Sequence, residues 1–387
     1  MAWALTPLTE EQREIQKVAG DFAAAEIAPF SAQWDRDQHF EPSLVPKLGA
    51  VGFLGMMIPE AYDGLGLATL SYLVALEEIA IVDASVAVML SVHNSLPTQM
   101  ILKWGSEKQK EQFLKPMARG ELLGAFALSE PEAGSDAASL RTQAVRDGGD
   151  WILNGTKAWV SSGTKGEVIV AMARTDTPDD RRGARGIGAF ILTPDLPGFH
   201  VGKKEDKMGL RASPTVQLHF NDMRVPGNRL LGQPGSGFIY AMQSLDNGRL
   251  GIAAQAIGIA EAALRHSAAY AAERKQFNKP IKEFQAIQFK LADMATRVAS
   301  ARALLHMSAT AKDRGEHITQ FGAMAKLLAS ETAMWVTTQA IQIFGGYGYV
   351  KDYPVERLFR DAKVTEIYEG TSEIQRIVIA RELYSHT

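Results

Sequence analysis

Hydrophobic and polar positions follow a helical period over the first third of the chain. Between Thr9 and Pro29, apolar residues recur at spacings of three and four, and Thr9 with Gln12 forms a capping-box pattern at the start. Residues 83–105 are apolar over a longer stretch and predict a mostly buried helix. We therefore predict an N-terminal helical domain that covers residues 1–121.

The period changes to that of strands near residue 122. Short apolar runs separated by glycine, proline and aspartate fill residues 122–235, and residues 216–220 alternate apolar and polar side chains as a half-buried strand does. Asn154–Gly155, flanked by strand-forming residues, is typical of a two-residue hairpin turn. This section predicts a small antiparallel β-domain.

The helical period returns after a glycine- and proline-rich linker at residues 232–237. Apolar residues between Ile287 and Leu305 step by four and three, which draws one apolar stripe along a long helix. Residues 321–344 are apolar nearly all round and predict a buried helix. A helical bundle over residues 236–387 follows. The predicted fold class is therefore mostly α with a middle antiparallel β-domain.

Composition narrows the possible partners and locations. The chain has 387 residues, which suits two or three domains, and its 41 basic and 44 acidic residues give a net charge of −3. No long block of like charge is present, so nucleic acid is not expected as a partner. No run approaches the roughly 18 to 20 apolar residues that span a bilayer, and no secretory leader pattern opens the chain. We expect no membrane span and a cytoplasmic protein.

Missing residue types and motifs exclude several chemistries. The chain has no cysteine, which removes disulfides, thiolate nucleophiles and iron–sulfur clusters, so redox chemistry would need a bound organic cofactor. The histidines are scattered without metal-ligand spacing, and no metal site is expected. Glycine patterns of dinucleotide-binding domains and P-loops are absent, as is the G-x-S-x-G motif of serine hydrolases.

The stretch EIYEGTSE at residues 366–373 sets three carboxylates beside a glycine and two hydroxyls. By local composition it reads as a helix start, with Thr371 or Ser372 as N-cap, Gln375 completing a capping box and the carboxylates complementing the helix dipole. The alternative is that one glutamate is a catalyst. The local residues favour capping.

Two further stretches carry candidate binding chemistry. LSEPEAGSDAASL, at residues 128–140, presents hydroxyls and backbone N–H groups that suit an anion or a heterocycle edge, although turn capping explains it equally simply. In KAWVSSG, Trp159 and Ser161 are two apart, so on a strand they lie on one side. That pair suits stacking on a flat cofactor. Otherwise Trp159 is a core aromatic and Ser161 a surface residue.

Six motifs in one order and spacing resolve these alternatives. LSEPEAGSDA, KAWVSSG, LDNGR, ERKQFNKPI, QIFGGYGYVKDYPVER and IYEGTSEIQRIVIARE together resemble the acyl-CoA dehydrogenase flavoprotein family, in particular its short-chain and isobutyryl members. The resemblance covers essentially the whole chain. It implies an N-terminal helical domain, a barrel-like middle β-domain and a C-terminal four-helix bundle, in agreement with the periodicity.

The resemblance assigns the chemistry to one glutamate. Glu369 matches the family's catalytic base, which removes the α-proton of a CoA thioester while a hydride leaves the β-carbon for flavin N5, giving a trans-2-enoyl-CoA. Gly370 would give this base room and contact the substrate. The family's oxyanion hole combines the backbone N–H of the base with a flavin ribityl hydroxyl. Some members carry the base on the LDNGR helix, but the corresponding residue here is Gly248, which leaves Glu369 without a rival.

The resemblance also implies FAD as cofactor and assigns its contacts. The predicted FAD contacts are Phe126, Leu128, Ser129, Trp159, Ser161, Arg274, Phe277, Gln285, Gln342, Gly345, Gly346, Thr371 and Glu373. The predicted contacts of the CoA thioester are Ser135, Asp246, Arg249 and Gly370. Arg274, Phe277, Gln285 and the residues from Gln342 to Gly346 would complete the FAD site of a neighbouring subunit, so a homo-oligomer, usually a tetramer, is implied.

The resulting hypothesis is FAD-dependent dehydrogenation of a short straight or branched acyl-CoA, with electrons passed to an electron-transfer flavoprotein. Medium-chain specificity is one alternative, and an oxidase-like enzyme that uses O₂ is another. A nitroalkane-oxidising relative is disfavoured because its base is usually an aspartate. A non-catalytic acyl-CoA-binding or assembly protein is disfavoured by the intact set of predicted FAD contacts.

Overall fold

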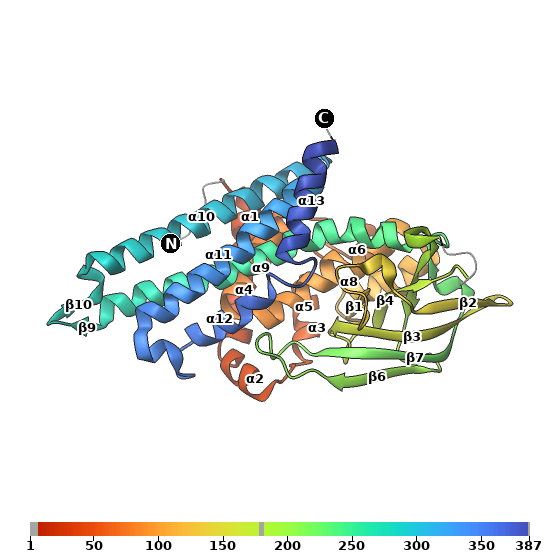
Figure 1. The fold of residues 1–387 in the computed structure, drawn as a ribbon, viewed down its shortest axis with the longest axis horizontal. Coiled ribbons are helices and arrows are strands. Elements are labelled where there is room, and N and C mark those ends of the chain that lie inside the picture. Colours follow the sequence, from red (N-terminus) through yellow and green to blue (C-terminus); the bar gives the residue numbers. More distant parts are fainter. Residues whose placement is uncertain (1–6, 178–181, 386–387) are drawn as a thin grey trace.

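The computed structural model describes residues 7–177 and 182–385, and its first part is helical (Figure 1). The helices are α1 (Glu10–Phe22), α2 (Ser31–Asp37), α3 (Leu44–Ala50), α4 (Thr69–Val82), α5 (Ala84–Ser95), α6 (Pro97–Trp104), α7 (Glu107–Gln109) and α8 (Lys115–Ala118). The predicted capping box is confirmed, because Gln12 N–H donates to Thr9 Oγ1 and Thr9 N–H donates to Gln12 Oε1.

The buried segment at residues 83–105 is two helices rather than the single helix that we predicted. Asp83 caps α5 by accepting hydrogen bonds from the N–H groups of Ser85 and Val86. Leu96 then leaves the helical conformation, and Pro97 begins α6 at its first position. The proline ring disfavours helical geometry in the preceding residue, which explains the break.

The middle part is an eight-stranded sheet in the order β6-β7-β3-β2-β4-β5-β8, with β1 beside β4. Its strands are β1 (Gly124–Ala127), β2 (Gln143–Asp147), β3 (Asp150–Ser161), β4 (Val168–Arg174), β5 (Ile187–Leu192), β6 (Phe199–Lys204), β7 (Thr215–Val225) and β8 (Leu230–Leu231). The pairings are antiparallel except those of β4 with β1 and β2, which are parallel. The alternation predicted for residues 216–220 is confirmed on β7, where the apolar side chains are buried.

The predicted hairpin turn at Asn154–Gly155 is wrong. Both residues lie inside the continuous strand β3, and the turn is at Gly148–Gly149, where Asp147 pairs with Asp150. Gly155 is required by close approach instead, because a Cβ there would lie 2.7 Å from the Cα of Thr142. The register of β3 against β7 also shifts at this point, so the glycine marks a bulge.

Helices return at residue 237 and pack around α9. They are α9 (Gly237–Glu273), α10 (Gln285–Asp313), α11 (Thr319–Phe344), α12 (Val355–Val364) and α13 (Ser372–Ser385). The stripe predicted on α10 is confirmed, with Met294, Val298 and Leu305 buried. On α11, Phe321 and Leu328 are exposed, so this helix is buried on one side rather than all round. None of the helices in residues 7–177 and 182–385 is long and apolar enough to cross a membrane.

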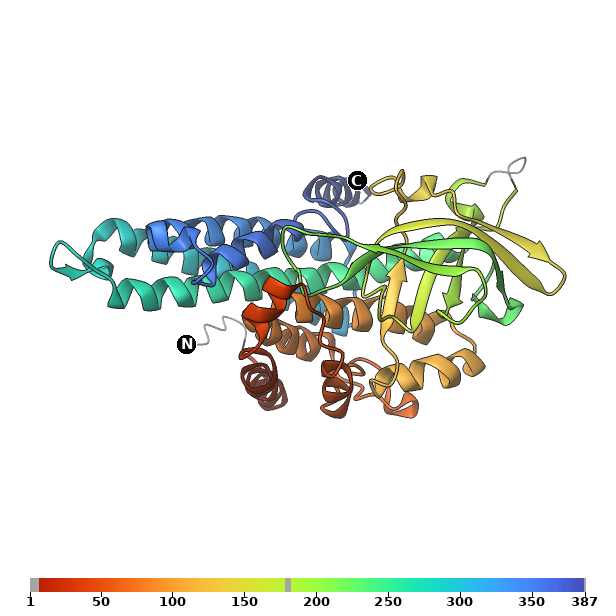
Figure 2. The ribbon, with the colours of Figure 1, turned by 90° about the horizontal axis from the view of Figure 1, so that it is seen from below.

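The molecule is elongated, with the sheet at one end and the β9–β10 hairpin (Lys275–Gln276 and Lys279–Pro280) at the other (Figures 1 and 2). Helix α9 runs between the two ends and packs against α4 and α5 on one side and α11 on the other. Its middle stretch, residues 248–263, is buried throughout. The centre of α9 is therefore where the N-terminal and C-terminal helices meet.

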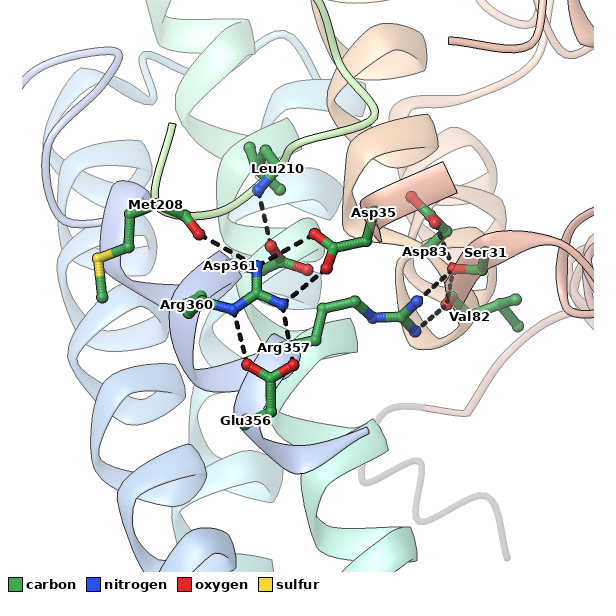
Figure 3. A network of polar contacts seen from close by, with 10 residues as sticks. All are labelled: Ser31, Asp35, Val82, Asp83, Met208, Leu210, Glu356, Arg357, Arg360 and Asp361. Atoms are coloured by element: carbon green, nitrogen blue, oxygen red, sulfur yellow. Dashed lines mark hydrogen bonds and ion pairs between the residues drawn. The ribbon is translucent and has the colours of Figure 1, made fainter. Parts of the chain in front are cut away.

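Helix α12 ties the three parts of the chain together (Figure 3). Arg360 Nη2 donates to Asp35 Oδ2 of α2 at 2.7 Å, and Arg360 Nη1 donates to the carbonyl of Met208, in the connection after β6, at 3.0 Å. The buried Asp361 accepts a 2.7 Å hydrogen bond from Leu210 N–H in the same connection. We call these contacts the α12 junction. It fixes the helix that leads directly into residues 366–373.

Candidate active site

Glu369 lies in the short connection between α12 and α13, in a strained backbone conformation. Its φ is 52° and that of Gly370 is 92°, so two successive residues adopt left-handed geometry. A glycine takes this conformation without penalty, whereas a glutamate does not, and such strain is concentrated at functional sites. The connection places the side chain of Glu369 against α9.

Thr371 caps α13, but the predicted capping box with Gln375 is wrong. Ile374 N–H donates to Thr371 Oγ1 at 3.3 Å, and Gln375 N–H donates to the Thr371 carbonyl at 2.9 Å. The side chain of Gln375 turns back to the connection instead. Its Nε2 donates to the carbonyls of Glu369 and Gly370, at 3.2 and 2.8 Å. Local capping thus explains Thr371 and leaves Glu369 with another role.

The carboxylate of Glu369 is buried and has no hydrogen-bond partner among the described residues. It points at Gly248 of α9, where an added Cβ would lie 2.9 Å from Glu369 Cδ and closer still to Oε2. Buried carboxylates are normally hydrogen-bonded, so an unpaired one marks a group kept available for a ligand or a reaction. The backbone N–H of Glu369 is likewise without a partner in the described part of the chain.

Two cations partly offset the burial of this carboxylate. Burial raises the pKa of Glu369 to about 7, while the charges of Lys326 on α11 and Arg249 on α9 act in the opposite direction. Arg249 is itself buried and donates to Asp246 Oδ1 at 2.5 Å, and Asp246 Oδ2 accepts a hydrogen bond from Thr319. Arg249, predicted as a CoA contact, thus lies near Glu369 in the interior, and the half-buried Asp246, also predicted as a CoA contact, is bonded to Arg249.

A second glycine, Gly251, extends the face of α9 that lacks side chains at Gly248. Gly251 lies one turn after Gly248, and a Cβ there would lie 3.2 Å from the hydroxyl of Tyr72 on α4 and closer still to Ser91 Oγ on α5. Both hydroxyls are buried. Tyr72 also lines a small cavity, together with Phe53, Met56, Leu76 and Leu90, among others. The space beside Glu369 is therefore bounded by α4, α5 and α9.

Five predicted cofactor contacts lie together at the edge of the sheet. They are Phe126, Leu128, Ser129, Trp159 and Ser161. Ala158 N–H donates to the carbonyl of Ser129 at 2.9 Å, which joins the segment after β1 to β3. Trp159, at φ 61° in a bulge, is 63% exposed, whereas the neighbouring Val160 is fully buried. An exposed indole beside backbone and hydroxyl groups fits a flat, polar-edged group.

A buried ion pair that the sequence motifs do not identify supports this edge. Lys157 Nζ donates to Glu130 Oε1 at 2.8 Å and to the carbonyl of Leu128 at 3.1 Å, and the two charged side chains are 0% and 4% exposed. Glu130 also accepts the N–H groups of Arg141 and Thr142. Burial would raise the pKa of Glu130, but the charge of Lys157 and these hydrogen bonds keep it below its usual range. By sequence alone, Glu130 is interpreted only as a turn cap.

Lys157→Met is expected to lower the free energy of unfolding by about 3 to 5 kcal/mol, because it leaves the Glu130 carboxylate buried without its cation. Flavin content should fall with it, since the pair holds the Leu128 carbonyl. Denaturant unfolding of the purified protein measures the first effect and absorbance the second. Arg224→Met, which breaks a half-exposed pair with Asp147, is the control and should cost no more than about 1 kcal/mol. Equal losses in both variants would contradict the prediction.

Six predicted cofactor contacts are not near this edge in the same chain. They lie at the far end of the helical bundle: Arg274, Phe277, Gln285, Gln342, Gly345 and Gly346. Phe277 is 88% exposed, and the Arg274 guanidinium lies over the ring of Tyr347 at 5.3 Å. Of the remaining predicted contacts, Ser135 is exposed after β1 and Glu373 is exposed in the first turn of α13. One chain therefore does not assemble the whole predicted set.

Family models match consecutive parts of the chain. The N-terminal domain of acyl-CoA dehydrogenase matches residues 9–121, the middle domain matches 125–223 and the C-terminal domain matches 235–384. The chain belongs to the acyl-CoA dehydrogenase family. This acyl-CoA dehydrogenase is an oxidoreductase, and like its family it is FAD-dependent.

Relatives of this acyl-CoA dehydrogenase include short-chain enzymes. The short-chain specific acyl-CoA dehydrogenase of mouse mitochondria is 49% identical over 97% of this chain and 90% of its own length. Butyryl-CoA dehydrogenase from Megasphaera elsdenii shares the fold with a TM-score of 0.95, at 44% identity over 99% of this chain and 100% of that one.

Two further solved relatives bear on cofactor and partner. A chain from a structural study of the electron transferring flavoprotein of Acidaminococcus fermentans matches with a TM-score of 0.95, at 46% identity over 99% of both chains. A glutaryl-CoA dehydrogenase from Mycobacterium smegmatis, solved in complex with FADH2, matches with a TM-score of 0.93, at 31% identity over 98% and 95% of the two chains. The predicted three-part fold, its family and its cofactor are thereby confirmed.

Proposed function

We propose that this chain dehydrogenates short straight or branched acyl-CoA thioesters to trans-2-enoyl-CoA, with Glu369 as the base that removes the α-proton. The observation that carries the proposal is the buried carboxylate of Glu369, which has no hydrogen-bond partner in the described chain and faces a gap left by Gly248. Bound FAD supplies the acceptor for the β-hydride. Butyryl-CoA and isobutyryl-CoA are the substrates that we expect to react fastest.

The geometry gives Glu369 two functions. Its carboxylate is held dry and without competing donors, which suits abstraction of a weakly acidic proton beside a thioester. Its unpaired N–H can donate to the thioester oxygen, where negative charge develops as the α-proton leaves. In this proposal the left-handed backbone of Glu369, with φ 52°, would let the carboxylate and the N–H of one residue serve the same substrate. Gly370, with φ 92°, permits the turn and adds no side chain.

Short acyl chains are supported by what surrounds Glu369. Gly248 faces the Glu369 carboxylate, and one turn later the side chains of Tyr72 and Ser91 stand directly opposite Gly251 and limit the space there. The resemblance to short-chain relatives points the same way. Anaerobic titration of the flavin absorbance with butyryl-, isobutyryl-, octanoyl- and palmitoyl-CoA tests this. Bleaching by palmitoyl-CoA alone would overturn the short-chain proposal, and no bleaching by any thioester would overturn the function.

We further propose that FAD is shared between subunits of a homotetramer. Leu128, Ser129, Trp159, Ser161 and Thr371 would hold it in one subunit. Arg274, Phe277, Gln285 and the residues from Gln342 to Gly346 would reach it from a neighbour. The exposure of five of these residues at the far end of the bundle supports this, because in a single chain they lie apart from the sheet edge. The five are Phe277, Gln285, Gln342, Gly345 and Gly346. An electron-transfer flavoprotein is the proposed electron acceptor.

An oxidase-like reaction remains the second candidate and differs only in the acceptor. Rapid reoxidation of the reduced enzyme by air, with formation of hydrogen peroxide, would favour it. Slow reoxidation by air together with fast reoxidation by an electron-transfer flavoprotein supports the dehydrogenase proposal.

The rate of flavin reduction is expected to rise with pH through about 7. The pKa of Glu369 is raised to about 7 by burial, so below that pH the group is protonated and cannot accept the α-proton. Above it the carboxylate dominates and the rate should level off. A profile of kcat/KM for butyryl-CoA against pH measures the midpoint in the free enzyme. A rate that falls as pH rises through this range would contradict the assignment.

A further inference from the structure

Lys326 is a fully buried lysine that contacts the Glu369 connection from α11. Its side chain is 0% exposed, and its Nζ donates a 2.7 Å hydrogen bond to the carbonyl of Gly370. An ammonium group has three N–H donors. Among the described residues, Lys326 Nζ has one hydrogen-bond acceptor, which is this carbonyl. Burying a charged lysine this completely costs free energy unless nearby hydrogen bonds or opposite charges compensate for the lost water.

The charge of Lys326 acts on Glu369 through space. No hydrogen bond joins the two side chains. Burial raises the pKa of the Glu369 carboxylate, and the ammonium of Lys326 has the largest effect in the opposite direction. Arg249 from α9 is the second cation, and among the residues that the structure describes the phenols of Tyr72 and Tyr368 are the other titratable groups that face this carboxylate. Lys326 itself also faces Arg249, Glu366 and Glu373. Burial lowers the pKa of Lys326 to about 8, so the group is charged at neutral pH.

We propose that Lys326 is a positioning residue for Glu369, which holds the strained connection through the Gly370 carbonyl and stabilises the carboxylate form of the base by its charge. The inference rests on the proposed function of Glu369. It adds a residue that neither a local motif nor the predicted contacts identify.

The backbone contact explains how the left-handed connection is kept. The Gly370 carbonyl accepts from both Lys326 Nζ and Gln375 Nε2, and the Glu369 carbonyl also accepts from Gln375. These donors lie on α11 and α13, on two sides of the connection. Because these carbonyls are held, the peptide planes that follow Glu369 and Gly370 are held with them. Lys326 therefore acts on the backbone that follows Glu369 by a hydrogen bond and on the Glu369 carboxylate by its charge.

Lys326→Met removes both the charge and the donor, and Lys326→Gln keeps a donor without the charge. In both variants the midpoint of the pH profile of flavin reduction by butyryl-CoA is expected to move up by about one pH unit or more. At a fixed pH below the midpoint, the rate should fall about tenfold if the midpoint moves up by about one pH unit, because the ionised fraction of the base falls by that factor. Above the midpoint, the Lys326→Gln rate should approach the wild-type rate, because the base is then ionised in both proteins.

A second measurement does not depend on turnover. The carboxyl group of Glu369 can be titrated by infrared difference spectroscopy without substrate, with its band assigned by its absence in Glu369→Gln. The same upward movement of the midpoint is expected there. Lys312→Met is the control, since Lys312 is a partly buried lysine on α10 whose charge acts on Asp313 rather than Glu369, and it should leave the midpoint unchanged.

An unchanged midpoint in folded Lys326→Met and Lys326→Gln would overturn the proposal, as would an equal loss of rate at every pH. If the wild-type flavin is not reduced by any acyl-CoA, the proposed function fails instead. The infrared titration would still report whether Lys326 acts on Glu369, so the two failures are distinguishable.

Discussion

Glu369→Gln is expected to bind butyryl-CoA and to reduce its flavin about 10³- to 10⁴-fold more slowly than the wild-type protein. Glutamine fills the same space beside Gly248 but cannot accept the α-proton, so binding is kept and the chemical step is lost. Anaerobic stopped-flow absorbance measures the rate, and the spectral change on ligand binding measures affinity.

Glu366→Gln is the matched control for this variant. Glu366 lies in the same connection but forms an ion pair with Lys363 at 2.6 Å on the surface side of α12. Its replacement should change the rate by less than about threefold, because exposed pairs contribute little. Full bleaching of the Glu369→Gln protein at the wild-type rate would remove Glu369 from the mechanism.

Gly248→Ala is expected to lower kcat/KM for butyryl-CoA about a hundredfold while the fold and flavin content are retained. The new methyl group would occupy the position of the Glu369 carboxylate, which must move aside. The clash is with the end of a flexible side chain rather than with backbone, so the cost falls on the alignment of the base and not on stability. A displacement of about 1 Å can cost about a hundredfold in rate.

Gly322→Ala provides the comparison. Gly322 is a buried helical glycine on α11, and a Cβ there would lie 3.5 Å from the carbonyl of Asp246, which is an ordinary contact distance. This variant should keep the wild-type rate and thermal stability. The prediction for Gly248→Ala fails if its rate matches that of Gly322→Ala, or if it loses its fold instead.

Periodicity predicted most of the fold because the main elements have one buried face. The stripe on α10 and the alternation on β7 both recur at the period of the element, so the pattern alone located them. The wrong predictions concern residues whose role depends on a partner distant in sequence or on a single break in a long pattern. Gly155 looks like a turn residue, yet its missing side chain makes room for Thr142. Pro97 divides the buried segment, although the apolar pattern continues on both sides of it.

The residues of the candidate site likewise divide into those that the sequence could predict and those that depend on partners distant in sequence. The register of six motifs assigns the role of base to Glu369, although its immediate neighbours favour helix capping. Lys326 and the Glu130–Lys157 pair were missed, because these residues lie 44 and 27 positions from their partners and no spacing rule links them. Buried polar partners are selected by three-dimensional proximity, and a single sequence holds no local signal for that. Only the packed arrangement of α9, α11 and the sheet reveals them.

The α12 junction makes the connection that carries Glu369 sensitive to substitutions far away in the sequence. Arg360 and Asp361 anchor α12 to Asp35 and to the carbonyl and N–H of the connection after β6, only a few residues before Glu369. A substitution at Asp35, in another part of the chain, would therefore loosen the base before it unfolded the protein. Such variants would be purified in good yield with flavin bound. Their defect would be classed as catalytic, although its cause is the loss of contacts that hold α12 in place.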